Sequence, residues 1–498
     1  MKKSNDILTL KMAEIFSIIY FAMILALLPL YFDAKIYTAM INAKGKCYLF
    51  IAAVMGIFLL ITFITSVVRK EPAIRFTGQK KSPMDIAMLA FSGAVLLSFL
   101  FSENKKVAWF GTGGFHVGTF SIVTLVVFYF FVSRSLQGSQ RHWDLIIILN
   151  TIIFAWVVLD TVSTNFFGVR TQLGRQKLQY FGSLGQMDSV SAYLCMILPI
   201  VIVFFLNQKK IQFWTCTCVL FGLTALTGIR TDGVYIGIAV CAIFLIPYAL
   251  RDELRFQNLL WLGLVWGVAI TFYSVFSVVA PDKIGTDMGV SGTLIHYWIG
   301  VMMIVFCGAL LIWIEKKRVL PSGKIRNILS WVASIVLIIA IAVFLLSGAI
   351  NIANENFGWG NSRGGIWSAV LNLFAAYNPL QKLFGLGMTA AGEDLAYFSA
   401  QLLEWATSVR IVNAHNDFLE YLISTGIVGL VAYTATWVVP IVEHVKSRKS
   451  GKEWSVTKMA YFMALMGYLG QSVVGNPYSL SVPIIYLIFA LYRNEDFN

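Results

Sequence analysis

The sequence predicts an all-α polytopic membrane protein with about fourteen transmembrane helices and one large external helical loop. Three observations lead to this fold class. Hydrophobic residues make up 58% of the 498 residues and charged residues 13%, and the mean hydropathy is +0.75; a soluble domain is far more polar. Apolar runs of roughly 17–22 residues recur along the chain, and each is long enough to cross about 30 Å of hydrocarbon. Basic residues gather in alternate loops between the runs.

In chain order, the apolar runs lie near residues 14–32, 47–68, 84–101, 117–133, 144–163, 188–206, 211–228, 233–250, 257–279, 292–314, 328–349, 424–443, 457–474 and 479–492. We expect the first to be an uncleaved signal anchor, because no small-residue cleavage site follows it. The loops expected on the cytoplasmic side are short, and no Walker-type phosphate loop occurs in the sequence. Residues 1–498 are therefore expected to form a single integral membrane domain, in which any enzyme must use an already activated substrate.

The net charge of +13 does not indicate nucleic-acid binding. Lysines and arginines cluster at residues 69–81, 316–326 and 446–458, which are alternate loops of the predicted topology. This bias fixes orientation by the positive-inside rule and attracts anionic lipid headgroups. It predicts that both termini are cytoplasmic and that the loop from about 350 to 420 is external.

The six cysteines all lie in or at the ends of predicted spans. None lies in the external loop, where an oxidising compartment would favour a disulfide. Cys216 and Cys218 would point to different faces of one helix. We therefore expect the cysteines to serve in apolar packing, with neither a metal nor another cofactor.

The external loop is expected to contain two helices. The first begins at Arg363, after Ser362, and stops near Pro379. A turn follows at 385–387, and a second helix with an apolar stripe runs from Glu393 to about Arg410. This second helix is too short and polar to span the membrane. It either packs over the bundle as a lid or bounds a groove for an acceptor.

The candidate site consists of ionisable residues on the external face, because charge within lipid is costly and tends to be functional. His415 closes the external loop, in the segment 413–420. Arg230 lies in a tight turn between two spans, and Arg363 opens the first external helix. His116 lies at the outer end of another span.

An arginine–histidine set suits transfer from a lipid diphosphate. Guanidinium groups bind phosphate oxygens in a bidentate manner and stay charged at any working pH. They would stabilise the departing diphosphate, while a neutral imidazole accepts the proton of the attacking hydroxyl. Each residue also has a structural interpretation: an external arginine often contacts headgroups, and a loop histidine often caps a helix. Three such residues on one face favour the functional interpretation.

Several ordered motifs resemble the O-antigen ligase and polysaccharide polymerase superfamily of bacterial membrane glycosyltransferases. The resemblance covers about residues 180–440. Its elements are the segment 182–186, the turn Thr227-Gly228-Ile229-Arg230, Arg363 followed by Trp367 and Gly385-Leu386-Gly387, and Ala414-His415-Asn416 followed by Gly426 and Gly429. The chain departs from the family in having Ile229 for a serine, His116 for an arginine, and about two more spans than the ligases.

The resemblance implies that Arg230 and Arg363 bind the undecaprenyl diphosphate of a glycan donor and that His415 activates the acceptor hydroxyl. His116, Asn416 and Trp367 are weaker candidates. It also implies an inverting reaction without a metal, on the outer face of the bacterial plasma membrane, in polysaccharide biosynthesis for the cell envelope.

Three functions remain open from the sequence. A ligase would pass the glycan to a sugar, lipid or protein acceptor, and a polymerase would pass it to a second lipid-linked repeat unit. A lipid-linked oligosaccharide flippase would also have about fourteen spans, but it should show two related halves and charged residues in mid-span. We favour the ligase.

Overall fold

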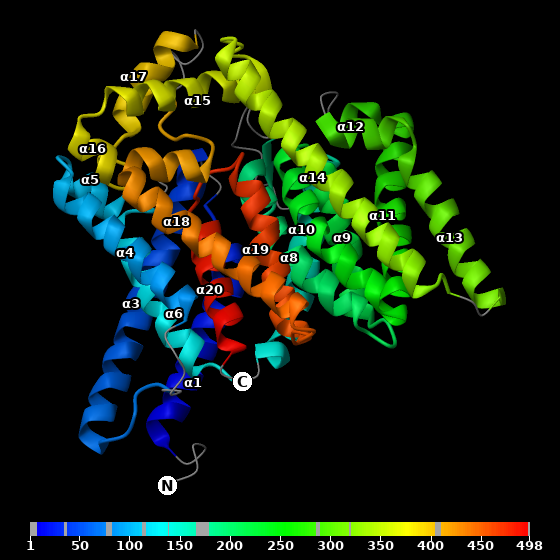
Figure 1. Ribbon diagram of the computed structural model, residues 1–498, viewed down its shortest axis with the longest axis horizontal. Helices are drawn as coiled ribbons and strands as arrows, with labels where there is room; N and C mark the ends of the chain where they lie inside the picture. Colours follow the sequence, from blue (N-terminus) through cyan, green and yellow to red (C-terminus); the bar gives the residue numbers. More distant parts are fainter. Residues whose placement is uncertain are drawn as a thin grey trace.

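The fold consists of helices that run between two ends of the molecule (Figure 1). This computed structural model describes residues 7–33, 37–75, 82–111, 116–137, 139–165, 179–284, 289–317, 320–403 and 410–496. The start of the first helix and the end of the last lie at one end, which we call the termini end. Residues 359–402 lie at the opposite end, which we call the loop end.

Each of the apolar runs predicted from the sequence coincides with a helix, except the run at 292–314, which is divided between two helices. The long helices are α1 (Leu8–Ala22), which continues through a π-helical turn (Met23–Leu27) into α2 (Leu28–Leu30), α3 (Tyr37–Arg69), α4 (Pro83–Phe101), α6 (Thr119–Ser135), α7 (Trp143–Thr161), α8 (Met187–Leu206), α9 (Phe213–Gly228), α10 (Asp232–Arg251), α11 (Glu253–Val279), α13 (Ile299–Lys317), α14 (Gly323–Ala353), α18 (Asp417–Lys449), α19 (Val456–Ser472) and α20 (Ser481–Asn494). Among the described residues, ten helical segments are long and apolar enough to cross a membrane. The all-α polytopic fold is therefore confirmed.

Shorter elements connect these helices. They are α5 (Lys105–Phe110), α12 (Gly289–His296), α15 (Trp359–Ala376), α16 (Pro379–Phe384) and α17 (Gly392–Leu402), with 3-10 turns at Ser139–His142 and Pro281–Lys283. Two short antiparallel strands, β1 (Tyr180–Phe181) and β2 (Gly185–Gln186), pair Tyr180 with Gln186. The run predicted at 292–314 is divided between α12 and α13, because Trp298 adopts a left-handed conformation (φ 53°).

The helices differ greatly in how far the protein covers them. The apolar stretch of α8 is completely buried, whereas only 17% of that of α13 and 6% of that of α14 are buried. A helix that is apolar on every side belongs either in a core or in lipid. Thus α8 is the centre of the bundle, and α13 and α14 expose their apolar sides at its periphery.

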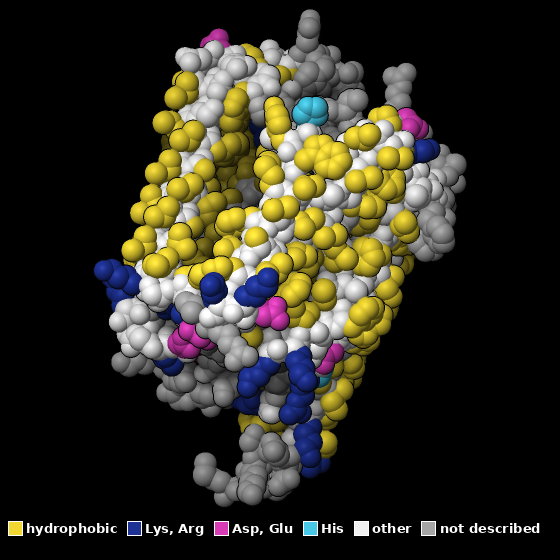
Figure 2. Space-filling model, turned by 90° about the vertical axis from the view of Figure 1, so that its right-hand side faces the viewer, with side chains coloured by type: hydrophobic (Ala, Val, Ile, Leu, Met, Phe, Trp, Pro, Cys, Tyr) yellow, Lys and Arg dark blue, Asp and Glu magenta, His cyan; other side chains and the backbone are white. Residues whose placement is uncertain are grey.

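Figure 2 views the side of the molecule that carries α13. Hydrophobic side chains cover the middle of this face, and Lys and Arg side chains gather below them, toward the termini end. A hollow separates two ridges of hydrophobic side chains; α14 packs on α10, and α13 packs on α11. An apolar belt of this kind is the surface that a bilayer covers. The protein is a multi-pass membrane protein.

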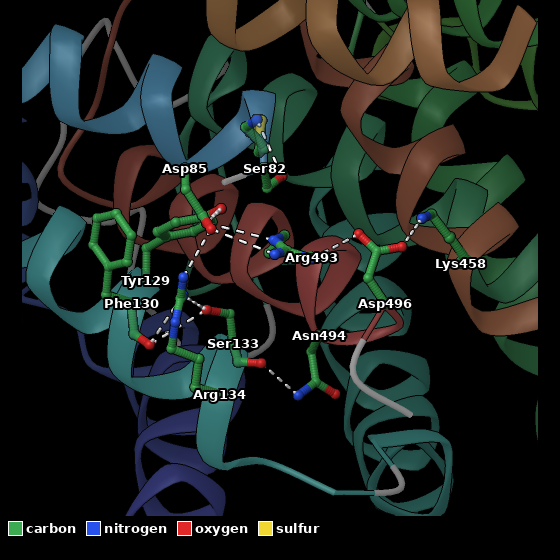
Figure 3. A network of polar contacts seen from close by, with 11 residues as sticks. Ser82, Asp85, Tyr129, Phe130, Ser133, Arg134, Lys458, Arg493, Asn494 and Asp496 are labelled. Atoms are coloured by element: carbon green, nitrogen blue, oxygen red, sulfur yellow. Dashed lines mark hydrogen bonds and ion pairs between the residues drawn. The ribbon is translucent and has the colours of Figure 1, made fainter. Parts of the chain in front are cut away.

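A buried charge network joins three helices, α4, α6 and α20, at the termini end (Figure 3). The carboxylate of Asp85, in the first turn of α4, accepts hydrogen bonds from Tyr129 and Arg134 of α6, both at 2.8 Å. Arg493 of α20 donates to the same carboxylate at 3.4 Å and to Asp496 at 3.0 Å. Removing one partner of a buried charge pair is strongly destabilising. The network therefore fixes the end of α20 against α4 and α6.

At the loop end, the two predicted external helices exist with different limits. Ser362 and the two residues before it have left-handed backbone angles, so regular helix in α15 begins at Arg363, as predicted. The second prediction was too long: α17 ends at Leu402, and residues 404–409 lie outside the described residues. Arg410 instead folds back and pairs with Glu393.

The apolar stripe of α17 packs within the loop end. Leu395 is fully buried with Ala369, Val370 and Leu373 of α15, and Phe398 packs against the same cluster. The described part of this stripe therefore packs against α15, and Trp405 and Val409, which the sequence analysis also assigned to the stripe, lie outside the described residues.

Candidate functional site

His415 lies in the short segment that leads into α18. Asn416 caps this helix, because its Oδ1 accepts the backbone N–H of Leu419 at 3.1 Å. Glu420 reaches back and accepts the backbone N–H of Ala414 at 2.9 Å. These two bonds on either side of His415 fix its backbone, which is left-handed at φ 48°. For Asn416, the structure thus shows a capping contact.

A chain of polar side chains leads from the His415 ring into the bundle. Asn476, in the loop between α19 and α20, places its Nδ2 3.3 Å from Nδ1 of His415. The same Nδ2 donates to the Tyr478 hydroxyl at 3.2 Å. That hydroxyl donates to Oε1 of Gln186, at the start of α8, at 3.5 Å. The imidazole is thereby oriented by groups from a different part of the chain.

The electrostatic surroundings keep the His415 ring neutral at ordinary pH. Its pKa is lowered from 6.5 to about 4, mainly by burial; the negative charge of Asp188 opposes this shift, and the positive charge of Arg363 contributes to it. Burial disfavours the charged form because an imidazolium loses its hydration. A neutral imidazole has one ring nitrogen that can accept a proton.

Asp188 connects this site to the turn that carries Arg230. One of its carboxylate oxygens accepts from Nε2 of Gln186 at 3.0 Å, and the other accepts from the Thr231 hydroxyl at 3.3 Å. Thr231 precedes α10 and directly follows Arg230. The start of α8 therefore lies between the His415 chain and the Arg230 turn.

Arg363 and His415 both contact the loop between α19 and α20. The Arg363 guanidinium donates to the Val474 carbonyl from Nε at 3.3 Å and from Nη2 at 3.0 Å, and Val474 is two residues from Asn476. Its Nη1 donates to the Gly360 carbonyl at 3.0 Å. These acceptors are uncharged, and within the described part of the chain no carboxylate pairs with Arg363. The guanidinium therefore keeps its full charge for a ligand.

Arg230 is half-buried and donates from Nη2 to the Thr161 carbonyl at 3.4 Å. Its backbone, like that of His415, is left-handed (φ 59°). A residue other than glycine in this region carries strain of order 1–3 kcal/mol, which concentrates at functional sites. The structure thus places Arg230, Arg363 and His415 at the loop end, with Asp188 and the α19–α20 loop between them.

Of the remaining two candidates, Trp367 belongs to the same buried apolar cluster as Val474, whereas His116 contacts α3. The Nε2 of His116 is 3.1 Å from Asn42 of α3, and its ring lies against Gly45. Trp367 is 7% exposed and packs against Trp359, with 5.8 Å between ring centroids. Both side chains make structural contacts within the described part of the fold.

The sequence analysis missed the residues that orient the site, namely Gln186, Asp188, Thr231, Asn476 and Tyr478. Two signals were present in the chain. Asp188 is an acidic residue in the first turn of an otherwise apolar helix, where charge is costly. Asn476 lies in Gly475-Asn476-Pro477, a turn between two apolar runs.

A comparison with protein families matches residues 291–434 to a model described as O-Antigen ligase. The match includes Arg363 and His415 and ends before Asn476. A search of curated proteins found no match. The fold is therefore a multi-span helical membrane protein in which residues 291–434 are similar to the O-Antigen ligase domain.

Proposed function

We propose that the protein is a glycosyltransferase that moves a glycan from undecaprenyl diphosphate to an acceptor hydroxyl on the outer face of the bacterial plasma membrane. The observation that carries the proposal is the meeting of Arg363 and His415 on the α19–α20 loop. A fixed cation and a neutral imidazole are the two groups that departure of a diphosphate and attack by a hydroxyl require.

The distribution of charge supports this orientation. Lys316 and Lys317 end α13, and Lys446, Arg448 and Lys449 end α18. Figure 2 shows Lys and Arg gathered toward the termini end. Cytoplasmic loops carry this excess of basic residues. With the termini end in the cytoplasm, the loop end and His415 face outward.

The hollow beside α14 gives the donor lipid a route to the site. It lies between two ridges of hydrophobic side chains on the face of the molecule that carries α13 (Figure 2). Arg363 follows α14 at the loop end, and Arg230 precedes α10 at the same end. An apolar polyprenyl chain along this hollow would therefore bring its diphosphate to the two guanidinium groups.

The reaction then follows from the positions of these groups. The acceptor oxygen bonds to the anomeric carbon of the glycan, the bond from that carbon to the diphosphate oxygen breaks, and undecaprenyl diphosphate leaves with the bonding electrons. Arg230 and Arg363 stabilise the negative charge of the leaving group. His415 accepts the proton of the acceptor hydroxyl. A single displacement inverts the anomeric configuration. In this scheme the two arginines, and no metal ion, stabilise the charge of the leaving diphosphate.

The proton must reach Nε2 of His415, because Asn476 faces Nδ1. With the amide nitrogen toward the ring, Nδ1 accepts a hydrogen bond and Nε2 carries the ring proton. Rotation of the amide by a half-turn would place Oδ1 against Nδ1–H and leave Nε2 free. We assign Asn476 as the positioning residue that makes His415 a base.

The ligase and the polymerase differ in their acceptor. Incubation of the purified protein with undecaprenyl-diphosphate-linked repeat units alone separates them. A ligase leaves these units unchanged until a separate acceptor is supplied, which is the result we expect. A ladder of lengthening lipid-linked products would instead identify the polymerase.

A further inference from the structure

A second basic site lies at the termini end, on the opposite side of the bundle from His415. Arg251 ends α10, Arg255 lies in the first turn of α11, and Arg448 lies in the last turn of α18. Together with Lys452, they line a cavity of about 120 Å³. Four cations from three helices and a loop thus face one space.

The cations in this cavity have little opposite charge around them. Glu453 is the one carboxylate among the described residues that line it; its side chain is 76% exposed, and it lies 3.9 Å from Arg255. No carboxylate in the described part of the chain pairs with Arg251 or Arg448. Arg251 is within electrostatic reach of Glu453, and also of both Arg255 and Arg448. An empty cavity therefore leaves like charges facing one another, which is unfavourable.

Helix ends alone do not explain this arrangement. A cation in the last turn of a helix is favoured by the helix dipole, which accounts for Arg251 and Arg448 taken singly. It does not account for Arg255, which lies at the opposite, N-terminal end of its helix. The guanidinium carbon of Arg255 is 4.2 Å from the centre of the Tyr248 ring, and Nε is 3.8 Å from Asp252. Arg255 is therefore held in place facing the other two arginines.

We propose that this cavity binds a phosphate group, supplied either by an anionic lipid headgroup or by a free phosphate. Guanidinium groups from different directions match the oxygens of a phosphate and cancel its charge. The three arginines lie where transmembrane helices end, which is the depth of the headgroups. Basic pockets between helix ends on the cytoplasmic side are sites of this type. The proposal is independent of the glycosyltransferase chemistry at the loop end.

Thermal unfolding of the purified protein in a detergent with an uncharged headgroup tests the proposal. The probes are dioctanoyl phosphatidylglycerol, dioctanoyl phosphatidylcholine and inorganic phosphate, at constant ionic strength. Phosphatidylglycerol well above its Kd should raise Tm by about 2 °C or more. An equal rise with inorganic phosphate would identify a general phosphate site, and a rise with the lipid alone would identify a headgroup site. An equal rise with the zwitterionic lipid would contradict the proposal, because its net charge is zero.

Two variants test whether the phosphate group binds in this cavity, because the arginines at the loop end also attract phosphate. The double variant Arg251→Gln and Arg448→Gln should lose most of the rise in Tm. Lys324→Gln, an exposed lysine at the same end outside the cavity, should retain it. Without ligand, the double variant should have the same Tm as wild type or a higher one, since repulsion is relieved. A rise that survives in the double variant, or no rise with any anion, would overturn the proposal.

Discussion

The Nδ1 atom of His415 lies 3.3 Å from Nδ2 of Asn476, a residue 61 positions further along the chain. An amide nitrogen only donates, so the neutral ring in this arrangement carries its proton on Nε2. Oδ1 of Asn476 is buried and has no hydrogen-bond partner among the described residues. A half-turn of the amide would give Oδ1 a partner in Nδ1–H. This one contact therefore determines which nitrogen of His415 is able to accept a proton.

Substitution of Asn476 tests that relationship. In Asn476→Asp, an oxygen faces Nδ1 of His415 in every rotamer, so glycan transfer should persist. The acid limb of the kcat profile should move to higher pH, because a carboxylate favours the imidazolium form of His415. Asn476→Ala removes the group that orients the His415 ring. It should lower kcat by as much as a general base contributes, which is roughly 10²–10⁴-fold. Glycan transfer measured across pH gives both results. Full activity in Asn476→Ala with loss in Asn476→Asp would mean that the contact is not catalytic.

The pKa of His415 predicts an unusual pH profile. In the proposed mechanism, activity requires the neutral His415 ring, which is present above its pKa of about 4, a value set mainly by burial. In the free enzyme, which kcat/KM reports, activity should stay constant from pH 8 to about 5.5 and fall only as pH approaches 4. Bound diphosphate adds negative charge and should raise the pKa seen in kcat. A kcat/KM profile that falls near pH 6.5 would indicate an ordinary, solvated histidine.

The arginines are expected to act through their shape as well as their charge. Lysine keeps the charge but loses the planar fork, so Arg230→Lys and Arg363→Lys should each lower kcat/KM by about tenfold or more, and alanine should lower it further. Arg410→Lys is a matched control at the loop end, since Arg410 is exposed and pairs with Glu393. If both lysine variants match the control, the arginines contribute only general positive potential.

Accessibility in intact cells tests the orientation. Tyr397 is 64% exposed at the loop end, and Lys324 is exposed at the termini end. A cysteine replacing Tyr397 should react with a membrane-impermeant thiol reagent, and one replacing Lys324 should react only after lysis. The described native cysteines are buried or half-buried, so the unsubstituted protein is the blank. Reversed labelling would place His415 in the cytoplasm, away from the proposed acceptor.

Most of the fold follows from the sequence because hydrophobic length determines where a helix crosses a bilayer. Breaks in helices and tertiary contacts do not follow from hydrophobic length. The division between α12 and α13 depends on the left-handed backbone of Trp298. A tryptophan in an apolar run does not predict such a break. The second external helix was predicted to reach Arg410 from its apolar spacing, but Arg410 turns back to Glu393.

The site shows the same limit. His415 and Arg363 stand out in the sequence because they are ionisable residues in a segment of a membrane protein that is predicted to be external. Their meeting on the Val474 and Asn476 loop depends on how α15, α18 and α19 pack, and local sequence carries no signal for that. Asp188 is more than two hundred positions before His415 in the chain, and its charge acts on His415 only because the fold brings the two residues together.

The most direct test of the account is transfer by the His415→Ala variant, measured with purified donor and acceptor and normalised to the protein recovered from the membrane. His415 is in a loop, and the helix cap is made by Asn416, so the variant should fold and reach normal abundance. We predict a loss of turnover of about 10²–10⁴-fold with little change in donor binding. Near-normal turnover by the folded variant would show that His415 is structural, and it would contradict the proposed mechanism.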